Sequence, residues 1–418
     1  MDRTFRQCTA KRSIAGDAFP RGVMDFDFSI GGKTTFIPSK SYFRIGVRLT
    51  QTDGITAPVT TDDFTFANFC PGNLFDNCYF LAGGQNVSNI VNYAPQAHAC
   101  GYRLKKSGAW LSTIGKDAYG IQSNWAARQQ KSASNGDLGT DPGHNLPIDQ
   151  VDQSIVYFMY QPPIGIMEHN KPLGSGDYRF QFNPNSNYKT ACIESNAAPL
   201  ASPADFNFEV QSMELYICTE KLDVSPTGTD LLHLMEHQVQ SKPITSAGEN
   251  NFDFTVPPST KALSIFVQSG KSGSNTLCPP SNFKCLDNAG DNKVDHQNGL
   301  RSIQLTYANV TKPPTRWTSE FGANTQKLQQ RYLDTQIESS QAFSSGGCET
   351  IAQWLESGLL LHYNWNRDAS DRSTQLQIQA DFSSMEANAN LFVIAHYSRS
   401  VELQISNGFI SSVNSLSI

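Results

Sequence analysis

Short segments in which apolar and polar residues alternate recur along the whole chain, and this period of two restricts the fold more than any other feature. The clearest examples are Tyr178–Phe182, Phe206–Val210, Ile303–Tyr307, Leu376–Phe382 and Val401–Ile405. Successive side chains of a β-strand point to opposite faces, so each segment predicts a strand with one buried and one wet face. The apolar run Leu391–Ala395 predicts a central strand. After Val210 the apolar phase slips by one residue, which predicts a bulge or a break between strands.

Helical patterns are scarce. The best candidate is Asn324–Gln341, where apolar residues such as Tyr332 and Ile337 fall near one face at helical spacing. A second candidate is Leu231–Gln240, which Pro243 would bring to an end. The sequence therefore predicts an all-β chain with only a few short helices.

The two halves of the chain resemble each other. Phe26–Ile30 has a counterpart in Phe252–Val256, because both contain the run Phe-Asp-Phe. A further strand signal follows each of them, Tyr42–Val47 in the first half and Leu263–Val267 in the second. This repetition predicts two similar units with Phe28 and Phe254 in equivalent places.

A length of 418 residues also suits two domains of roughly 200 residues each. We expect an N-terminal arm over 1–23, a first unit over 24–220, a connector over 221–245 and a second unit over 246–418. All-β units of this size are sandwiches or barrels. Two polar stretches, about 105–150 and 270–299, predict long exposed loops. Tandem β-units with such loops and no catalytic signature indicate jelly rolls.

Charge and cysteine usage narrow the possible roles. The formal net charge is −6, and no extended basic face is visible, so the chain as a whole is not an electrostatic nucleic-acid binder. The first 22 residues carry five basic and two acidic side chains, a net of +3. These residues form either a basic arm that lies on DNA or on an anionic membrane, or a frayed and solvated terminus.

Met1–Ser13 has no apolar signal region, and no run approaches the roughly 18 apolar residues of a membrane span. Nine scattered cysteines predict free thiols in a reducing compartment.

Three segments resemble the late strands of the first jelly roll in major capsid proteins of small double-stranded DNA viruses: Ile155–Pro163, Lys171–Leu173 and Asp177–Asn185. The family includes polinton-like viruses, adintoviruses and virophages and, more remotely, tectiviruses and adenovirus hexons. The segments Phe26–Leu49 and Leu391–Ile405 are similar to it as well. The resemblance is one of layout and spans nearly the whole chain.

The resemblance implies a double jelly roll, two tandem eight-stranded jelly rolls with long loops. It implies a homotrimer of nearly hexagonal outline that tiles an icosahedral shell beside penton and minor capsid proteins. Such a protein would reside in the virion after assembly inside the host cell. The family implies no catalytic residues, so none is carried over, and we expect no cofactor and no metal.

Several motifs suggest chemistry but have simpler explanations. His233-Leu234-Met235-Glu236-His237 matches a zinc-peptidase pattern, in which two histidines of one helix bind the metal. No third ligand follows on a later helix, so a connector between jelly rolls is the better interpretation. Cys278 and Cys285 lack the spacing of a metal site. Gly31-Gly32-Lys33-Thr34 lacks the first glycine of a phosphate loop and predicts a hairpin turn.

The five tryptophans are Trp110, Trp125, Trp317, Trp354 and Trp365. They could form a sugar-stacking platform, but core positions and subunit contacts are commoner for such residues. Trp110 and Trp125 fall in the first long loop, so we expect them at contacts between subunits. Three classes remain open on this basis: a capsid protein, a viral or phage receptor- or carbohydrate-binding β-sandwich protein, and a glycoside-active enzyme on a jelly roll.

Overall fold

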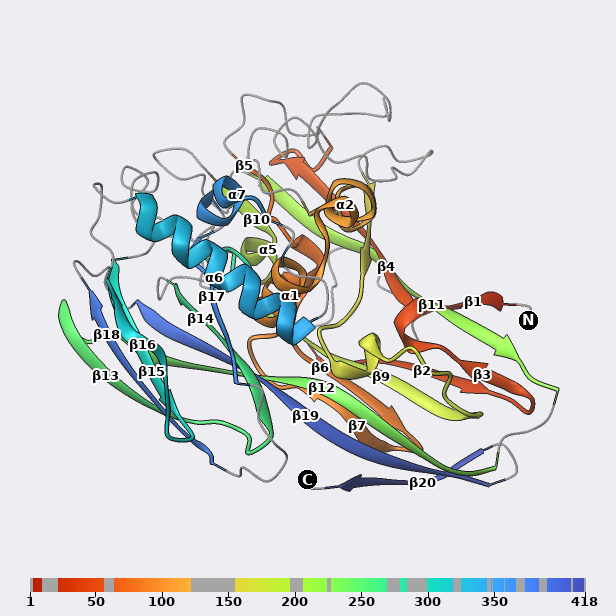
Figure 1. The fold of residues 1–418 in the computed structure, drawn as a ribbon. Helices are drawn as coiled ribbons and strands as arrows, with labels where there is room; N and C mark the ends of the chain where they lie inside the picture. The colour runs from red at the N-terminus through yellow and green to blue at the C-terminus, as the bar shows by residue number, and fades with distance from the viewer. Residues whose placement is uncertain are drawn as a thin grey trace.

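The computed structural model describes most of the chain. The described residues are 3–9, 22–55, 64–121, 155–195, 206–223, 227–268, 279–283, 299–318, 325–343, 347, 349–356, 358–365, 373–382, 389–406 and 409–416. In this part of the chain β-structure predominates, in two halves that lie side by side, with the helices gathered on one side of the sheets (Figure 1).

The first half contains two main sheets and a small strand pair. In sheet order, the first sheet is β1 (Arg3–Thr9), β11 (Phe206–Lys221), β4 (Tyr42–Gln51) and β8 (Ile155–Tyr160), with β3 (Thr34–Phe36) also paired to β11. The second sheet is β2 (Met24–Ile30), β9 (Gly176–Pro184), β6 (Phe75–Ala82) and β7 (Gln85–Ile90). The small pair is β10 (Ile193–Ser195) with β5 (Phe64–Phe66).

The second half repeats this arrangement. Its first sheet is β12 (Gly228–Pro243), β19 (Asn390–Ser406), β14 (Thr260–Gln268) and β17 (Leu361–Asn364), with β20 (Phe409–Leu416) also paired to β19. Its second sheet is β13 (Gly248–Thr255), β18 (Gln375–Phe382), β15 (Leu300–Tyr307) and β16 (Val310–Thr318). Strand for strand, the order in each sheet matches that of the first half. The chain is therefore two jelly rolls in tandem, as the sequence predicts.

The repeated Phe-Asp-Phe segment occupies the same place in both halves. Phe28 lies on the edge strand β2 opposite Tyr178, and Phe254 lies on the edge strand β13 opposite Leu376. The partner strands β9 and β18 hold equivalent positions in their sheets. The shared signal thus marks one structural position that both jelly rolls use.

The segment Leu391–His396 of strand β19 is buried on both faces and belongs to two cores. Leu391 and Val393 lie in the core of the second jelly roll, whereas Phe392 and Ile394 lie in a core that is mainly that of the first. This explains why the segment Leu391–Ala395 is apolar throughout, since a strand that is buried on both faces does not alternate between apolar and polar residues. The prediction of a central strand is confirmed. The predicted irregularity after Val210 is also confirmed, as a register shift between Val210 and Ser212 within the single strand β11.

The helices are α1 (Ala94–Lys105), α2 (Gly108–Trp110), α3 (Lys116–Tyr119), α5 (Tyr188–Ala191), α6 (Thr325–Phe343) and α7 (Ile351–Glu356). Shorter turns are η1 (Pro38–Lys40), η2 (Cys70–Leu74), η4 (Gly165–Glu168) and the π-helical η3 (Leu111–Gly115). Helices α1 and α6 contact each other where the two jelly rolls meet (Figure 1). Helix α6 confirms the predicted helix, but the prediction of its buried face was partly wrong. Ile337, expected on the buried face, is 55% exposed, whereas Thr335 and Ser339 are buried. None of the helices in the described ranges has the length and apolar character needed to cross a bilayer.

Four other predictions need correction. Leu231–Gln240 is not a helix but part of β12, which pairs with β19 along its whole length. Most of the predicted connector is therefore a sheet strand. Within the predicted arm, Arg3–Thr9 is not a frayed terminus but the strand β1, paired with β11. The first predicted loop begins with helical turns, α2 to α3, and its remainder falls outside the described residues. A turn does occur at Gly31–Thr34, closed by the bond from Thr34 N to Gly31 O. The predicted hairpin is wrong, however, because β2 pairs with β9 and β3 pairs with β11 in the other sheet.

Candidate functional site at the seam between the two jelly rolls

The peptidase-like motif lies on a strand, and this geometry separates its residues. His233 and His237 are four residues apart, which places them roughly 13 Å apart along β12. Glu236 and His237 point to opposite faces of the sheet, because neighbouring side chains alternate. Among the described residues, no group of three or more His, Cys, Asp or Glu could hold a metal ion. The three motif residues therefore do not form one site.

Glu236 is buried where β12 meets the first jelly roll. Its side chain is 1% exposed and accepts a hydrogen bond from Ser88 Oγ at 2.6 Å and a longer one from Gly165 N at 3.4 Å. Burial raises the pKa of this carboxyl group to about 7, although both hydrogen bonds oppose the shift. A methyl group added at Gly165 would lie 2.6 Å from Met235 O, so glycine allows η4 to approach the strand closely. Glu236 thus ties the two halves together through a carboxyl group that is easily neutralised.

A Glu236→Gln variant should lose the part of the pH dependence of stability that this group supplies. The folded pKa exceeds the unfolded one, so the stabilisation is complete below pH 4.5 and is lost as the pH rises through 7. Between pH 5 and pH 9 the free energy of unfolding of the variant should gain roughly 3 kcal/mol relative to the parent. Urea unfolding across this pH range measures the difference. The control is Glu249→Gln, which removes a carboxylate that is 57% exposed and should leave the profile unchanged. Parallel profiles of Glu236→Gln and parent would refute the assignment.

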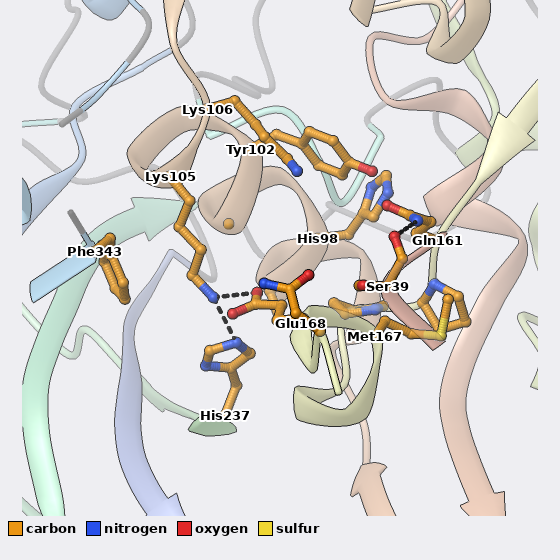
Figure 2. Close-up of a pocket in the computed structure, with 15 residues that line it drawn as sticks. Ser39, His98, Tyr102, Lys105, Lys106, Gln161, Met167, Glu168, His237 and Phe343 are labelled. Atoms are coloured by element: carbon orange, nitrogen blue, oxygen red, sulfur yellow. Dashed lines mark hydrogen bonds and ion pairs between the residues drawn. The ribbon is translucent and has the colours of Figure 1, made fainter. Parts of the chain in front are cut away.

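On the opposite face of the same sheet, polar side chains from six elements form one continuous chain of hydrogen bonds. Lys105 Nζ donates to Glu168 Oε1 at 2.5 Å and lies 3.1 Å from His237 Nε2 (Figure 2). His237 Nδ1 lies 3.0 Å from His396 Nδ1. The chain then continues through Ser264 Oγ, which is 2.7 Å from His396 Nε2 and 2.8 Å from His362 Nδ1.

The lysine fixes the direction of every bond in this chain. An ammonium group only donates, so His237 Nε2 accepts and its proton sits on Nδ1. His237 then donates to His396, His396 to Ser264, and Ser264 to His362. All three imidazoles are neutral in this arrangement. Their pKa values are lowered by burial first and by the Lys105 charge second or later, to about 3 for His362.

This chain resembles a catalytic serine–histidine pair in composition but not in access. Ser264 is 0% exposed, so no substrate can reach its hydroxyl group. The hydroxyl donates to His362, whose Nε2 is buried without a hydrogen-bond partner among the described residues. Within the described ranges, no carboxylate is bonded to that ring in the way a catalytic base requires. The arrangement fits a structural role at the seam.

A buried ion pair joins the same two halves. Arg103 of α1 donates from Nε to both carboxylate oxygens of Glu349, each at 2.9 Å, and from Nη2 to Gly358 O at 2.8 Å. The exposed fractions of the two side chains are only 2% and 7%. A pair so deeply buried and so well bonded resists separation, because either charge alone would remain without solvation.

The tryptophans predicted at subunit contacts have different outcomes. Trp110 is half-buried, and its ring packs against Tyr102 at 5.3 Å and Tyr119 at 5.4 Å within the same chain. Trp125 lies outside the described residues. The side chains of Trp354 and Trp365 are buried in the second core. The role of Trp110 and Trp125 between subunits stays a prediction.

The described thiols agree with the predicted free cysteines. Cys70, Cys78, Cys100, Cys192 and Cys218 are free and buried. Burial raises the pKa of Cys78 to about 12, so this thiol is protonated and unreactive. Cys278 and Cys285 lie outside the described residues.

Sequence reasoning missed most of this seam. Helix α1, which supplies Arg103 and Lys105, was not predicted, although Pro95 in its first turn is a usual helix-start signal. Ser264 and His396 were visible as polar residues within or directly after apolar strand runs, where a buried polar group needs a partner. Their partners come from distant parts of the chain, and no local pattern identifies them.

Comparisons with known proteins agree with the fold. No protein-family model matches the sequence, and no curated protein matches it. Among solved structures, a chain of the Sputnik virophage determined by cryo-electron microscopy is similar, with a TM-score of 0.63 and 13% identity over 99% of this chain and 88% of that chain. The mavirus major capsid protein has a TM-score of 0.59 and 10% identity, covering 99% and 90%. The Faustovirus major capsid protein has a TM-score of 0.51 and 9% identity, covering 97% and 90%.

These neighbours are double jelly-roll proteins. The class defined by the strand order is therefore the tandem jelly-roll proteins. Within that class, the fold of this chain is that of virophage major capsid proteins, matched along nearly the whole length of both chains.

Proposed function

We propose that this protein is the major capsid protein of a DNA virus and that it forms the icosahedral shell of the virion. The observation that carries the proposal is the duplication of both sheets with identical strand order, joined by a buried seam. The mavirus and Faustovirus neighbours are major capsid proteins by description. Its proposed role is structural, as a building block of the shell, so we propose no catalytic reaction for it.

Three copies around an axis would place six similar jelly rolls in a ring. Each jelly roll has exposed sheet edges, which natural proteins cover or pair. A closed ring of three chains satisfies this demand and gives a nearly hexagonal outline that tiles a surface. We propose this homotrimer as the capsomer, with Trp110 and Trp125 among its contacts. Its further partners would be neighbouring capsomers, penton proteins and minor capsid proteins.

The basic N-terminal segment has a second proposed role. Because Arg3–Thr9 pairs with β11, this part of the segment is anchored to the first jelly roll. We propose that the net positive charge of the first 22 residues contacts the packaged DNA or an inner membrane. When shells are reconstituted at increasing salt, this contact should be lost before the contacts between subunits, because salt screens the attraction between charges.

Purified full-length protein should form trimers and particles. Light scattering should give a mass three times that of the chain, and negative-stain microscopy should show hexagonal capsomers or shells. An obligate interface of this kind buries roughly 2,000 Å² or more, so trimers should persist on dilution. A monomer that persists at high concentration and forms no particles would contradict the capsid proposal. In that case, retention on a glycan array would favour the carbohydrate-binding alternative, and glycan turnover would favour the enzyme.

A further inference from the structure

A cavity of about 360 Å³ opens at the seam beside the Lys105 end of the hydrogen-bond chain (Figure 2). Both jelly rolls line it: the polar side chains include those of Ser39, His98, Lys106, Gln161 and His237. Its volume lies in the range of about 300–1,000 Å³ that is typical of small-molecule sites. Nothing in the proposed shell function uses this cavity.

The first sign of a ligand is His98 of α1, a buried ring with no hydrogen-bond partner. It is 2% exposed, and neither ring nitrogen has a partner among the described residues. Aromatic rings of Tyr102 and Tyr160 pack against it at 4.7 and 5.2 Å, so the imidazole is held in place. The hydroxyl group of Ser39, on the same cavity wall, is also buried without a partner. Native interiors rarely leave such groups unbonded.

The second sign is an unbalanced positive charge. Glu168 bonds to Lys105, whereas Lys106 has no carboxylate within ion-pair distance in the described part of the chain. The Lys106 ammonium group lies over the rings of Tyr102 and Trp110, at 5.5 and 5.1 Å. Burial, followed by the neighbouring Lys105 charge, lowers the pKa of Lys106 despite an opposing effect of Glu168. A bound anion would relieve this unfavourable burial of charge.

The rest of the wall has polar and apolar parts. Glu168, which bonds to Lys105, and Asn170 are polar, and the apolar part includes Ala97, Pro162, Pro163, Met167 and Phe343. We propose that this cavity binds a small organic anion, in which a carboxylate or phosphate group contacts Lys106 and His98 and an apolar body contacts the apolar part of the wall. Because both jelly rolls line the cavity, the ligand bridges them. Ligand binding therefore stabilises the seam, and the stabilisation grows with the logarithm of ligand concentration once the site is mostly occupied. This proposal goes beyond the shell function and holds whether or not the chain assembles.

Calorimetric titration of the full-length protein tests the proposal with three probes of similar shape: benzoate, phenyl phosphate and the neutral benzamide. At least one of the two anions should bind about tenfold or more tightly than benzamide and raise the melting temperature. The anion that binds better identifies the carboxylate or the phosphate as the natural group. Equal binding of all three probes, or no binding of either anion, would overturn the proposal, and this comparison needs no variant.

Variants then locate the site. Lys106→Met should abolish the preference for anions, and His98→Phe should weaken anion binding while keeping an aromatic ring in place. The matched control is Lys171→Met, which removes an exposed lysine that does not line the cavity. If Lys106→Met binds the anions as the parent does, or if Lys171→Met loses the preference equally, the site is not this cavity.

Discussion

Replacing Glu349 by Gln should destabilise the folded chain by about 3–5 kcal/mol, because it leaves the Arg103 guanidinium group buried without its counter-charge. Arg103 would keep its bond to Gly358 O, but a neutral carbonyl does not compensate a full charge. Most folded domains have only about 5–15 kcal/mol of stability. We therefore expect a large fall in the midpoint of urea unfolding.

An exposed ion pair of the same chain provides the control. Arg316 and Glu249 lie 2.7 Å apart, and the Glu249 side chain is 57% exposed. Glu249→Gln should cost less than about 1 kcal/mol, since solvent screens such pairs. A double variant, Arg103→Met with Glu349→Leu, should regain much of the loss, because it leaves no unpaired charge. If the two single glutamate variants cost the same, the seam pair is not the anchor that its burial indicates.

Mild acid should also destabilise the protein. His98, His237, His362 and His396 are buried and neutral, and burial lowers the pKa of each of them. Their folded pKa values lie below the unfolded value, so their stabilisation is present above pH 6.5 and is lost as the pH falls. For His98 and His362, with pKa values of about 3, the loss between pH 7 and pH 5 is roughly 4 kcal/mol. His237 and His396 act in the same direction.

Neighbouring charged groups either add to or offset this loss of stability, and the measurement has to separate them. Lys105 from α1 and Lys312 from β16 oppose protonation of His362. Glu236 acts in the opposite sense and returns about 2 kcal/mol over the same pH interval. The loss should therefore be clearest in Glu236→Gln protein, followed by urea unfolding between pH 8 and pH 4.

A histidine variant isolates one contribution. His362→Asn keeps a polar atom near Ser264 but cannot titrate, so it should reduce the slope by about 1.4 kcal/mol per pH unit. His233→Gln changes an exposed histidine of β12 and serves as the control. Stability that does not change between pH 7 and pH 5 would show that water or a proton reaches these rings without unfolding.

The strands could be predicted from the sequence because each carries its own period of two. The change of apolar phase after Val210 and the equivalent positions of Phe28 and Phe254 could be predicted for the same reason, because both are local patterns within a strand. The helix predicted at Leu231–Gln240 was wrong because the local pattern is ambiguous. Clustered apolar residues there suit a helix as well as a strand, and only pairing with β19 decides between them. Pairing partners more than a hundred residues away leave no trace in a local pattern.

The candidate site was largely hidden from sequence reasoning. The hydrogen-bond chain needs residues from α1, η4, β12, β14, β17 and β19 to meet, and no local pattern in any one of these segments points to the others. His237 was noticed, but for a helical metal motif that the strand geometry excludes. The cavity depends on His98 and Lys106, which sit on or beside the helix that the sequence analysis missed.

The double burial of β19 has a consequence for synthesis of the protein. In the chain the strand follows the whole first jelly roll and most of the second, yet Phe392, Ile394 and Val401 complete a core that consists mainly of first-half residues. A ribosome that has made the whole first jelly roll has therefore not yet made the strand that seals it. Until β19 emerges, apolar surface stays exposed and prone to association with other nascent chains. Chaperones should consequently hold the nascent chain until β19 has emerged, and a pulse-labelled product truncated before residue 390 should co-purify with them.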